Sequence, residues 1–199
     1  MLISFDVDSV LLDTETIILK KIKEIYDVEL SLKDVTYWNF YKNEYPLVLD
    51  VFQDISFYNN VNKIQNMDII MKNVISTYGS NNIQLITSSS KISAISKENC
   101  LDKHFGKIKD FNKIKIIHVG LYDENNNSHH KYIYSKNTIL IDDGIHNVSD
   151  HVEINKNNAL LIDYGYGWNQ NYKHNLVKRI KKQNDILPNL KNLLRIINE

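Results

Sequence analysis

Two carboxylates stand two positions apart near the start of the chain, in the segment Phe5-Asp6-Val7-Asp8-Ser9-Val10. They follow a short apolar run over residues 2–5, which has the length of a buried strand. Ligands of open α/β sheets bind at the carboxyl ends of strands, and residues i and i+2 can point the same way. Asp6 and Asp8 could therefore share a substrate, one attacking phosphorus while the other moves a proton. A solvated turn or a helix N-cap is the alternative interpretation.

A run of hydroxyl side chains follows a second apolar run, in Leu85-Ile86-Thr87-Ser88-Ser89-Ser90. Hydroxyls and free backbone amides at the start of a helix suit phosphate oxygens, so this motif is a candidate phosphate site. The alternative is that Ser89 or Ser90 simply caps the helix.

An acidic pair ends a third apolar run, in Ile139-Leu140-Ile141-Asp142-Asp143-Gly144. Magnesium takes hard oxygen ligands, commonly one or two carboxylates with waters and substrate phosphate, so Asp142 and Asp143 are candidate ligands, and a turn is the alternative. An ammonium beside the nucleophile would reduce its repulsion from a dianionic phosphate. Between the second and third motifs, the third predicted strand and the adjoining loop supply several lysines: Lys113, Lys115, Lys131 and Lys136.

The elements expected to position these motifs alternate between strands and helices, which predicts a parallel α/β sheet. The segment 15–65 interrupts the alternation and carries Tyr37-Trp38-Asn39-Phe40-Tyr41. We therefore predict an α/β core over residues 1–14 and 66–199, with 15–65 as a small helical cap. Trp38 and Phe40 could stack a nucleotide base, although aromatics in such a cap are more often core. Predicted strands lie at 2–5, 83–86, 114–119, 138–141 and 159–162, and predicted helices at 14–26, 67–78, 92–105 and 186–197.

Composition bounds the partners of the chain. With 199 residues and 43% hydrophobic content it can bury a core, and its 24 basic residues balance 24 acidic ones, so no stable nucleic-acid binding is expected. The single cysteine, the lack of a signal-peptide pattern and the absence of an apolar run of about 20 residues favour a cytoplasmic protein without membrane contact. The local basic run over residues 173–182 is interpreted as a solvated helix face.

Taken in order, the DxD, hydroxyl, lysine and DD motifs resemble those of the haloacid-dehalogenase-like phosphatase superfamily. Within it the chain looks most like the 5'(3')-deoxyribonucleotidases, including bacterial and phage forms. The narrower likeness depends on Thr36-Tyr37-Trp38-Asn39-Phe40, on Leu101-Asp102-Lys103-His104-Phe105-Gly106 and on Tyr166-Gly167-Trp168-Asn169. One departure is Ser9, which stands where the superfamily usually has glycine.

The resemblance implies a Rossmann-like three-layer core and a role for each motif. Asp6 would be the nucleophile and Asp8 the acid and base. Mg²⁺ would be held by the Asp6 carboxylate, the Asp8 main-chain carbonyl and Asp142, with Asp143 in support. Thr87, Ser88 and Lys131 would bind the phosphate.

The implied function is magnesium-dependent hydrolysis of deoxynucleoside or nucleoside monophosphates, a small-molecule substrate class, in deoxyribonucleotide catabolism. The implied location is the cytosol of a bacterium or of a phage-infected host. A homodimer is compatible with the resemblance, although no helix has an excess apolar face that requires one. The alternatives are a phosphatase for sugar phosphates or polynucleotide ends, and a catalytically degenerate phosphate-binding protein.

Overall fold

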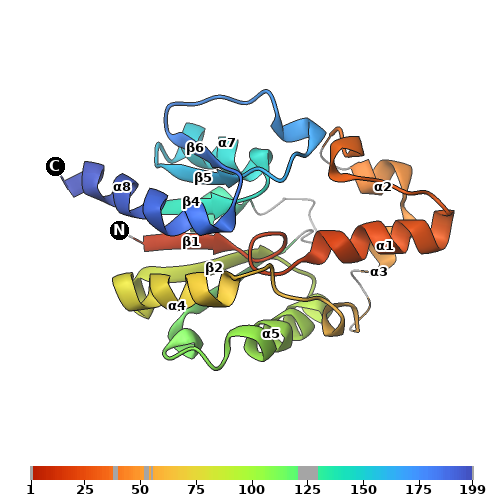
Figure 1. Cartoon of the computed structure of the whole chain (residues 1–199), viewed down its shortest axis with the longest axis horizontal. Helices are drawn as coiled ribbons and strands as arrows, with labels where there is room; N and C mark the ends of the chain where they lie inside the picture. Colours follow the sequence, from red (N-terminus) through yellow and green to blue (C-terminus); the bar gives the residue numbers. More distant parts are fainter. Residues whose placement is uncertain (1, 38–39, 52–53, 55, 121–129, 199) are drawn as a thin grey trace.

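A six-stranded, all-parallel sheet forms the centre of the molecule, with the strand order β3-β2-β1-β4-β5-β6 (Figure 1). The computed structural model describes residues 2–37, 40–51, 54, 56–120 and 130–198. The predicted α/β class with a parallel sheet is confirmed. The strands are β1 (Leu2–Asp6), β2 (Ile83–Ser88), β3 (Lys115–Val119), β4 (Thr138–Asp142), β5 (Ala159–Ile162) and β6 (Val177–Ile180).

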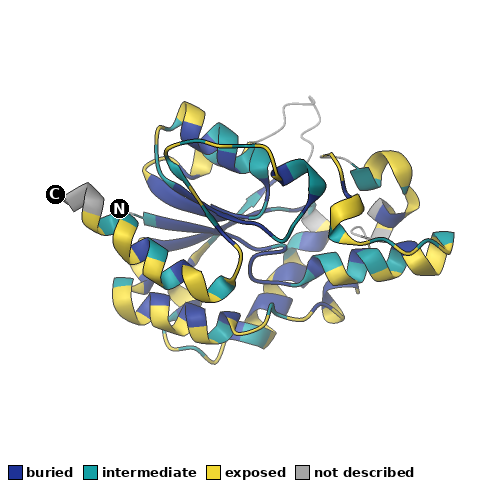
Figure 2. Ribbon diagram, turned by 45° about the horizontal axis from the view of Figure 1, so that its top comes forward, coloured by how far each residue is buried: buried dark blue, intermediate teal, exposed yellow. Residues whose placement is uncertain are grey.

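Helices cover both faces of the sheet, and the central strands are buried between them (Figure 2). Within β4, Ile139 and Ile141 join the larger apolar core, whereas Leu140 faces a second, smaller core shared with α7. This alternation is the period of two that a strand imposes on its side chains. The α-helices are α1 (Thr14–Tyr26), α2 (Phe40–Glu44), α3 (Leu47–Val51), α4 (Met67–Tyr78), α5 (Lys91–Phe105), α6 (Lys131–Tyr134), α7 (Ile145–Ile154) and α8 (Ile186–Asn198).

The register of β1 against β4 brings two of the motifs together. Phe5 pairs with Ile141 in the parallel ladder, so the next residues, Asp6 and Asp142, leave the sheet at the same level on neighbouring strands. On the other side of β1, Asp6 itself pairs with Ile86, and the hydroxyl motif begins one residue later. The three motifs therefore meet at one edge of the sheet.

The segment that was predicted as a cap contains α1, α2, α3 and the short 3-10 helices η1 (Leu32–Asp34) and η2 (Phe57–Asn59). Figure 1 shows α1 and α2 on the side of the molecule where β1 ends. The domain boundary at residue 65 stays a prediction. None of the helices in the described ranges has both the length and the apolar character needed to cross a bilayer.

One interpretation of the sequence was wrong. The basic run is not a helix face, because Lys178 and Arg179 lie in β6, the edge strand of the sheet. The Arg179 guanidinium is partly buried and pairs with the Asp163 carboxylate at 2.9 Å. A short edge strand with charged residues lacks the apolar run that reveals the inner strands.

Candidate active site

A buried ammonium bridges two of the predicted carboxylates. Lys131 Nζ lies 2.6 Å from Asp6 Oδ2 and 3.1 Å from Asp142 Oδ2, and the three side chains are nearly inaccessible to solvent. Burial by itself lowers the pKa of Lys131, but the carboxylates of Asp142 and Asp6 more than offset this and leave the pKa above its usual value. Lys131 opens the short helix α6, just before β4. The structure thus places this lysine in contact with the expected nucleophile.

The remaining oxygens of these carboxylates are held by the backbone where each strand ends. Asp6 Oδ1 accepts a hydrogen bond from the Val7 amide at 2.7 Å. Asp142 Oδ1 accepts from the Gly144 amide at 2.8 Å and from the Asn147 side chain at 3.1 Å. The orientation of both carboxylates is therefore set by donors within the protein itself.

Three carboxylates in this cluster fit a divalent cation. Asp6, Asp142 and Asp143 each offer an oxygen, and these atoms lie within 4.8 Å of one another. Two oxygens on one Mg²⁺ are at most about 4.2 Å apart, given Mg–O distances near 2.1 Å, so only a small adjustment is needed. The set consists of hard oxygen donors with one ammonium against three acidic groups. The chemistry of the donors therefore suits Mg²⁺.

Burial shapes the acidity of the same cluster. Burial raises the pKa of the Asp6 carboxyl to about 7, an effect that Lys131 opposes and that the charges of Asp142 and Asp8 reinforce. Burial also raises the pKa of Asp143 well above its usual range, with further contributions from the neighbouring carboxylates. Crowded buried carboxyls of this kind are stabilised by a bound cation or a proton.

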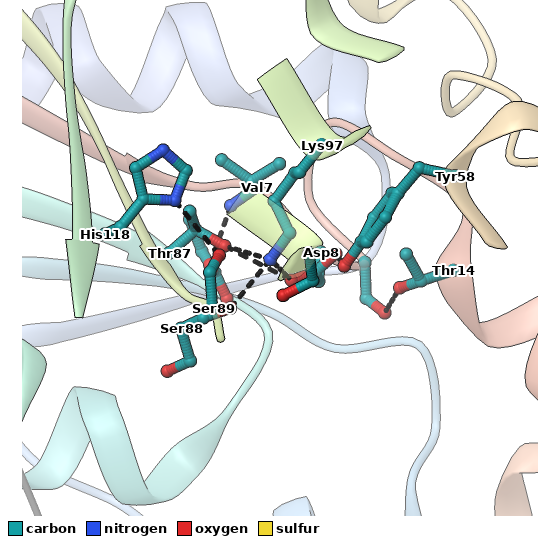
Figure 3. A network of polar contacts seen from close by, with 12 residues as sticks. Val7, Asp8, Thr14, Tyr58, Thr87, Ser88, Ser89, Lys97 and His118 are labelled. Atoms are coloured by element: carbon teal, nitrogen blue, oxygen red, sulfur yellow. Dashed lines mark hydrogen bonds and ion pairs between the residues drawn. The ribbon is translucent and has the colours of Figure 1, made fainter. Parts of the chain in front are cut away.

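Asp8 belongs to a separate network, shown in Figure 3. Its Oδ2 atom accepts from Lys97 Nζ at 2.6 Å and from the Thr87 hydroxyl at 3.2 Å, and its Oδ1 atom accepts from the Tyr58 hydroxyl at 3.0 Å. Lys97 comes from α5 and Tyr58 from η2. The expected acid and base is thus held by three donors, none of which is a neighbour in sequence.

The four residues of the hydroxyl motif have four different sets of contacts. The Thr87 hydroxyl is buried and engaged by Lys97 and Asp8, whereas Ser88 lines the pocket described below. Ser89 contacts His118 at 3.0 Å (Figure 3). Ser90 caps α5, where its side chain accepts from the Ser93 amide. Of the two predicted phosphate ligands, only Ser88 therefore reaches the pocket in this conformation.

One pocket of about 360 Å³ adjoins the cluster of Asp6, Asp142 and Asp143, the carboxylate of Asp8 and a wall of aromatic side chains. Ligand sites are typically about 300–1,000 Å³. Phe40 lines this pocket, whereas Trp38 lies outside the described residues. The lining includes Asp6, Asp8, Ser88, Lys131, Asp142 and Asp143 together with Tyr37, Phe40, Tyr41, Tyr166, Trp168, Glu15 and His146.

Glu15 lies in the wall of the same pocket, at the start of α1. The hydroxyls of Tyr41, from α2, and Tyr166, from the loop after β5, both donate to its carboxyl group. Burial nevertheless raises the pKa of Glu15 to about 7, with a smaller contribution from the Asp13 charge. This carboxyl therefore joins three separate segments of the chain beside the candidate site.

The segment Tyr166-Gly167-Trp168-Asn169 supports the acidic pair. The Asn169 side chain is fully buried, donates to the Asp143 carbonyl at 2.7 Å and accepts from the Ile145 amide at 3.2 Å. Trp168 packs against His146, with ring centroids 5.7 Å apart. Burial lowers the pKa of His146 to about 4, so this ring is neutral near pH 7.

Ser9 occupies a backbone position that favours glycine. The residue has a φ of 57°, in the left-handed region that glycine enters at least cost. Its hydroxyl lies 3.2 Å from that of Thr14, and its amide donates to the Leu12 carbonyl at 2.8 Å. The turn that follows Asp8 is thus retained with serine in the strained position.

Sequence reasoning missed Lys97, Tyr58 and Glu15. A signal for Lys97 existed, because Ser93, Lys97 and Cys100 recur at helical spacing and all lie on the buried face of α5. Tyr58 gives no such signal, since its contact with Asp8 depends on how η2 packs against α5.

Comparison with known proteins places the fold. No known family profile and no curated protein sequence matches the chain. Among solved structures it is similar to a haloacid-dehalogenase-like family hydrolase from Xanthomonas campestris, with 11% identity, a TM-score of 0.51, and coverage of 97% of this chain and 95% of that one. It is also similar to a candidate β-phosphoglucomutase from Thermotoga maritima, with 13% identity, a TM-score of 0.53, and coverage of 97% and 100%. The chain therefore has the haloacid-dehalogenase-like α/β fold.

Proposed function

We propose that this protein is a magnesium-dependent phosphomonoester hydrolase that dephosphorylates deoxynucleoside or nucleoside monophosphates through an aspartyl-phosphate on Asp6. The observation that carries the proposal is the single pocket that joins the carboxylate cluster to an aromatic wall. Carboxylates and an ammonium suit a phosphate ester, and aromatic faces suit a nucleotide base.

In the first half-reaction, an oxygen of Asp6 attacks phosphorus. The bond between phosphorus and the ester oxygen breaks, and that oxygen takes a proton from Asp8 as the nucleoside leaves. Lys131 contacts the nucleophile at 2.6 Å and lowers the pKa of Asp6 against the effect of burial, so more of the reactive carboxylate is present near pH 7. The ammonium also reduces repulsion between this carboxylate and the phosphate.

In the second half-reaction, water attacks the phosphorus of the aspartyl-phosphate. Asp8, now deprotonated, accepts a proton from the water, and the bond between phosphorus and Asp6 breaks to release inorganic phosphate. Both half-reactions thus use the same acid and base in opposite directions.

Asp6, Asp142 and Asp143 would hold Mg²⁺, with the Asp8 carbonyl as a further ligand. When bound, the ion would neutralise negative charge on the phosphate and orient it for in-line attack. Ser88 lines the pocket and is the hydroxyl proposed to bind a phosphate oxygen. Phe40 lines the same pocket and is the described cap residue proposed to contact the base.

The test is phosphate release from a panel of deoxynucleoside monophosphates, nucleoside monophosphates and sugar phosphates, with MgCl₂ or with EDTA. The wild type is compared with Asp6→Asn and with Asp68→Asn. Asp68 is a matched control because it lies on α4, outside the pocket lining, and its partly exposed carboxylate pairs with Lys63 at 3.2 Å. We expect magnesium-dependent release from nucleotides that Asp6→Asn abolishes and Asp68→Asn retains.

Two other results would change the assignment. Magnesium-dependent activity confined to sugar phosphates would retain the chemistry of Asp6 and remove the nucleotide from the proposal. No release from any ester by correctly folded wild type would favour the phosphate-binding alternative instead.

A further inference from the structure

Lys97 is a second buried ammonium at the candidate site, separate from Lys131. Its side chain is 1% exposed, and lysine is almost never fully buried unless it is paired. Its three protons match three acceptors: Asp8 Oδ2 at 2.6 Å, the Thr87 hydroxyl at 2.7 Å and the Ser88 carbonyl at 2.7 Å. Figure 3 shows the side chain pointing toward this group. Each acceptor belongs to a motif predicted to carry the chemistry.

Lys97 acts from behind the pocket, whose lining contains Asp8 and Ser88 but neither Lys97 nor Thr87. It is therefore not placed to touch a substrate, and any effect on the reaction must pass through the groups that it holds. The Lys97 ammonium also lies 5.2 Å from the centroid of the Tyr58 ring, a distance at which a cation and an aromatic face attract each other.

The contacts distinguish the two oxygens of Asp8. Oδ2 is anchored by Lys97 and Thr87, neither of which lines the pocket, whereas Oδ1 is contacted by Tyr58, which does line it. With one oxygen anchored, the carboxyl group cannot rotate without breaking its contacts to the buried ammonium. Oδ1 is then the oxygen left to exchange a proton with the leaving group.

We propose that Lys97 is a positioning residue that anchors Asp8 through Oδ2 and so orients Oδ1 for proton transfer to the leaving oxygen of the substrate. This inference rests on the proposed phosphatase function. A buried ion pair is weak evidence for stability. Orientation of Asp8 therefore accounts for the Lys97–Asp8 pair better than stabilisation of the fold does. A proton donor misplaced by about 1 Å can lose about 100-fold in rate.

The dependence of the reaction rate on the leaving group distinguishes a positioning role of Lys97 from a purely structural one. An alkoxide leaves poorly and needs the proton from Asp8, whereas 4-nitrophenolate leaves without one. The value of kcat/KM reports the first half-reaction for both kinds of ester. Loss of Lys97 should therefore lower kcat/KM for a deoxynucleoside monophosphate by about 100-fold, and for 4-nitrophenyl phosphate by no more than about 5-fold, since proton transfer contributes little there.

The experiment compares Lys97→Met, Asp8→Asn and the double variant on both esters with MgCl₂. Methionine keeps most of the length of the lysine side chain without its charge, and Lys97→Gln serves if Lys97→Met does not fold. Lys103→Met is the matched control, because Lys103 lies on the same helix and is exposed. We expect the double variant to be no slower on the nucleotide than Asp8→Asn alone, since Lys97 acts through Asp8.

Equal losses on both esters, or multiplicative losses in the double variant, would overturn the inference and make Lys97 a structural brace. In that case the wild type would still be an active phosphatase, so the proposed function would stand. A wild type inactive on both esters would instead remove the proposed function and this inference with it.

Discussion

Replacing Glu15 by glutamine is expected to make the folded state less sensitive to alkaline pH. The Glu15 carboxyl is enclosed beside the pocket by the hydroxyls of Tyr41 and Tyr166, and burial raises its pKa from 4.5 to about 7. Glutamine has the same shape and can still accept from both hydroxyls, but it never carries a charge. The variant thus removes only the cost of burying the ionised carboxylate.

The direction and size of the effect follow from this shift. Because the folded state binds the proton more tightly than the unfolded chain, the contribution of Glu15 to stability is fully present below about pH 4.5 and is lost as the pH rises through about 7. Each unit of pKa difference corresponds to about 1.4 kcal/mol. The full effect is therefore about 3 kcal/mol, of which less than about 1 kcal/mol has been lost at pH 5.

The assay is urea unfolding of the wild type and Glu15→Gln at pH 5 and at pH 8, in EDTA. At pH 8 the variant should be more stable than the wild type by about 2–3 kcal/mol, with an unchanged dependence of the unfolding free energy on urea. At pH 5 the two should nearly coincide. Asp6 and the other carboxyls of the site are common to both proteins, so their titration cancels in the comparison.

Glu24→Gln is the matched control, because Glu24 lies on the same helix, is exposed and pairs with Lys21 at 2.7 Å. It should leave the pH dependence of the wild type in place. A difference between Glu15→Gln and the wild type that is the same at both pH values would refute the reasoning, because it would show that Glu15 is not buried in its charged form.

Three further perturbations test the carboxylate cluster. Lys131→Met should lower the unfolding free energy at pH 8 by about 3–5 kcal/mol, since it leaves Asp6 and Asp142 buried without their ammonium. Urea titration in EDTA measures this loss, and MgCl₂ should restore part of the lost stability. A loss below about 1 kcal/mol would contradict the prediction. Asp142→Asn should abolish the rise in melting temperature that MgCl₂ gives the wild type in a thermal-shift assay; an undiminished rise would place the ion elsewhere. Asn169→Ala should cost about 1–3 kcal/mol in urea unfolding, because it removes the buried donor of the Asp143 carbonyl. An unchanged midpoint would show that water replaces the side chain.

Much of the fold could be predicted because the inner strands are buried on both faces. The predicted strand 159–162 coincides with β5, and the predicted helices 14–26 and 67–78 coincide with α1 and α4. The helix α7 was not predicted, although Val148 and Val152 recur at helical spacing, because polar residues separate them. Edge strand β6 was missed because Lys178 and Arg179 interrupt its apolar residues.

The candidate site could likewise be predicted only in part. Asp6 and Asp142 could be placed together from sequence because each follows an apolar run, and neighbouring parallel strands end at one edge. Asp8 could be found but not its partners, because the contact with Lys97 spans 89 positions and depends on the orientation of α5. Packing between elements, rather than any pattern along the chain, decides such contacts.

The central position of β1 has a consequence for how the chain folds. This strand is synthesised first, yet its partners in the sheet lie at residues 83–86 and 138–141. Contacts so distant in sequence require closure of long loops and slow the folding of a domain. During translation, β1 therefore cannot pair on both of its sides until β4 has been synthesised. The carboxylate cluster needs both β1 and β4, so it can form only after these two strands have paired.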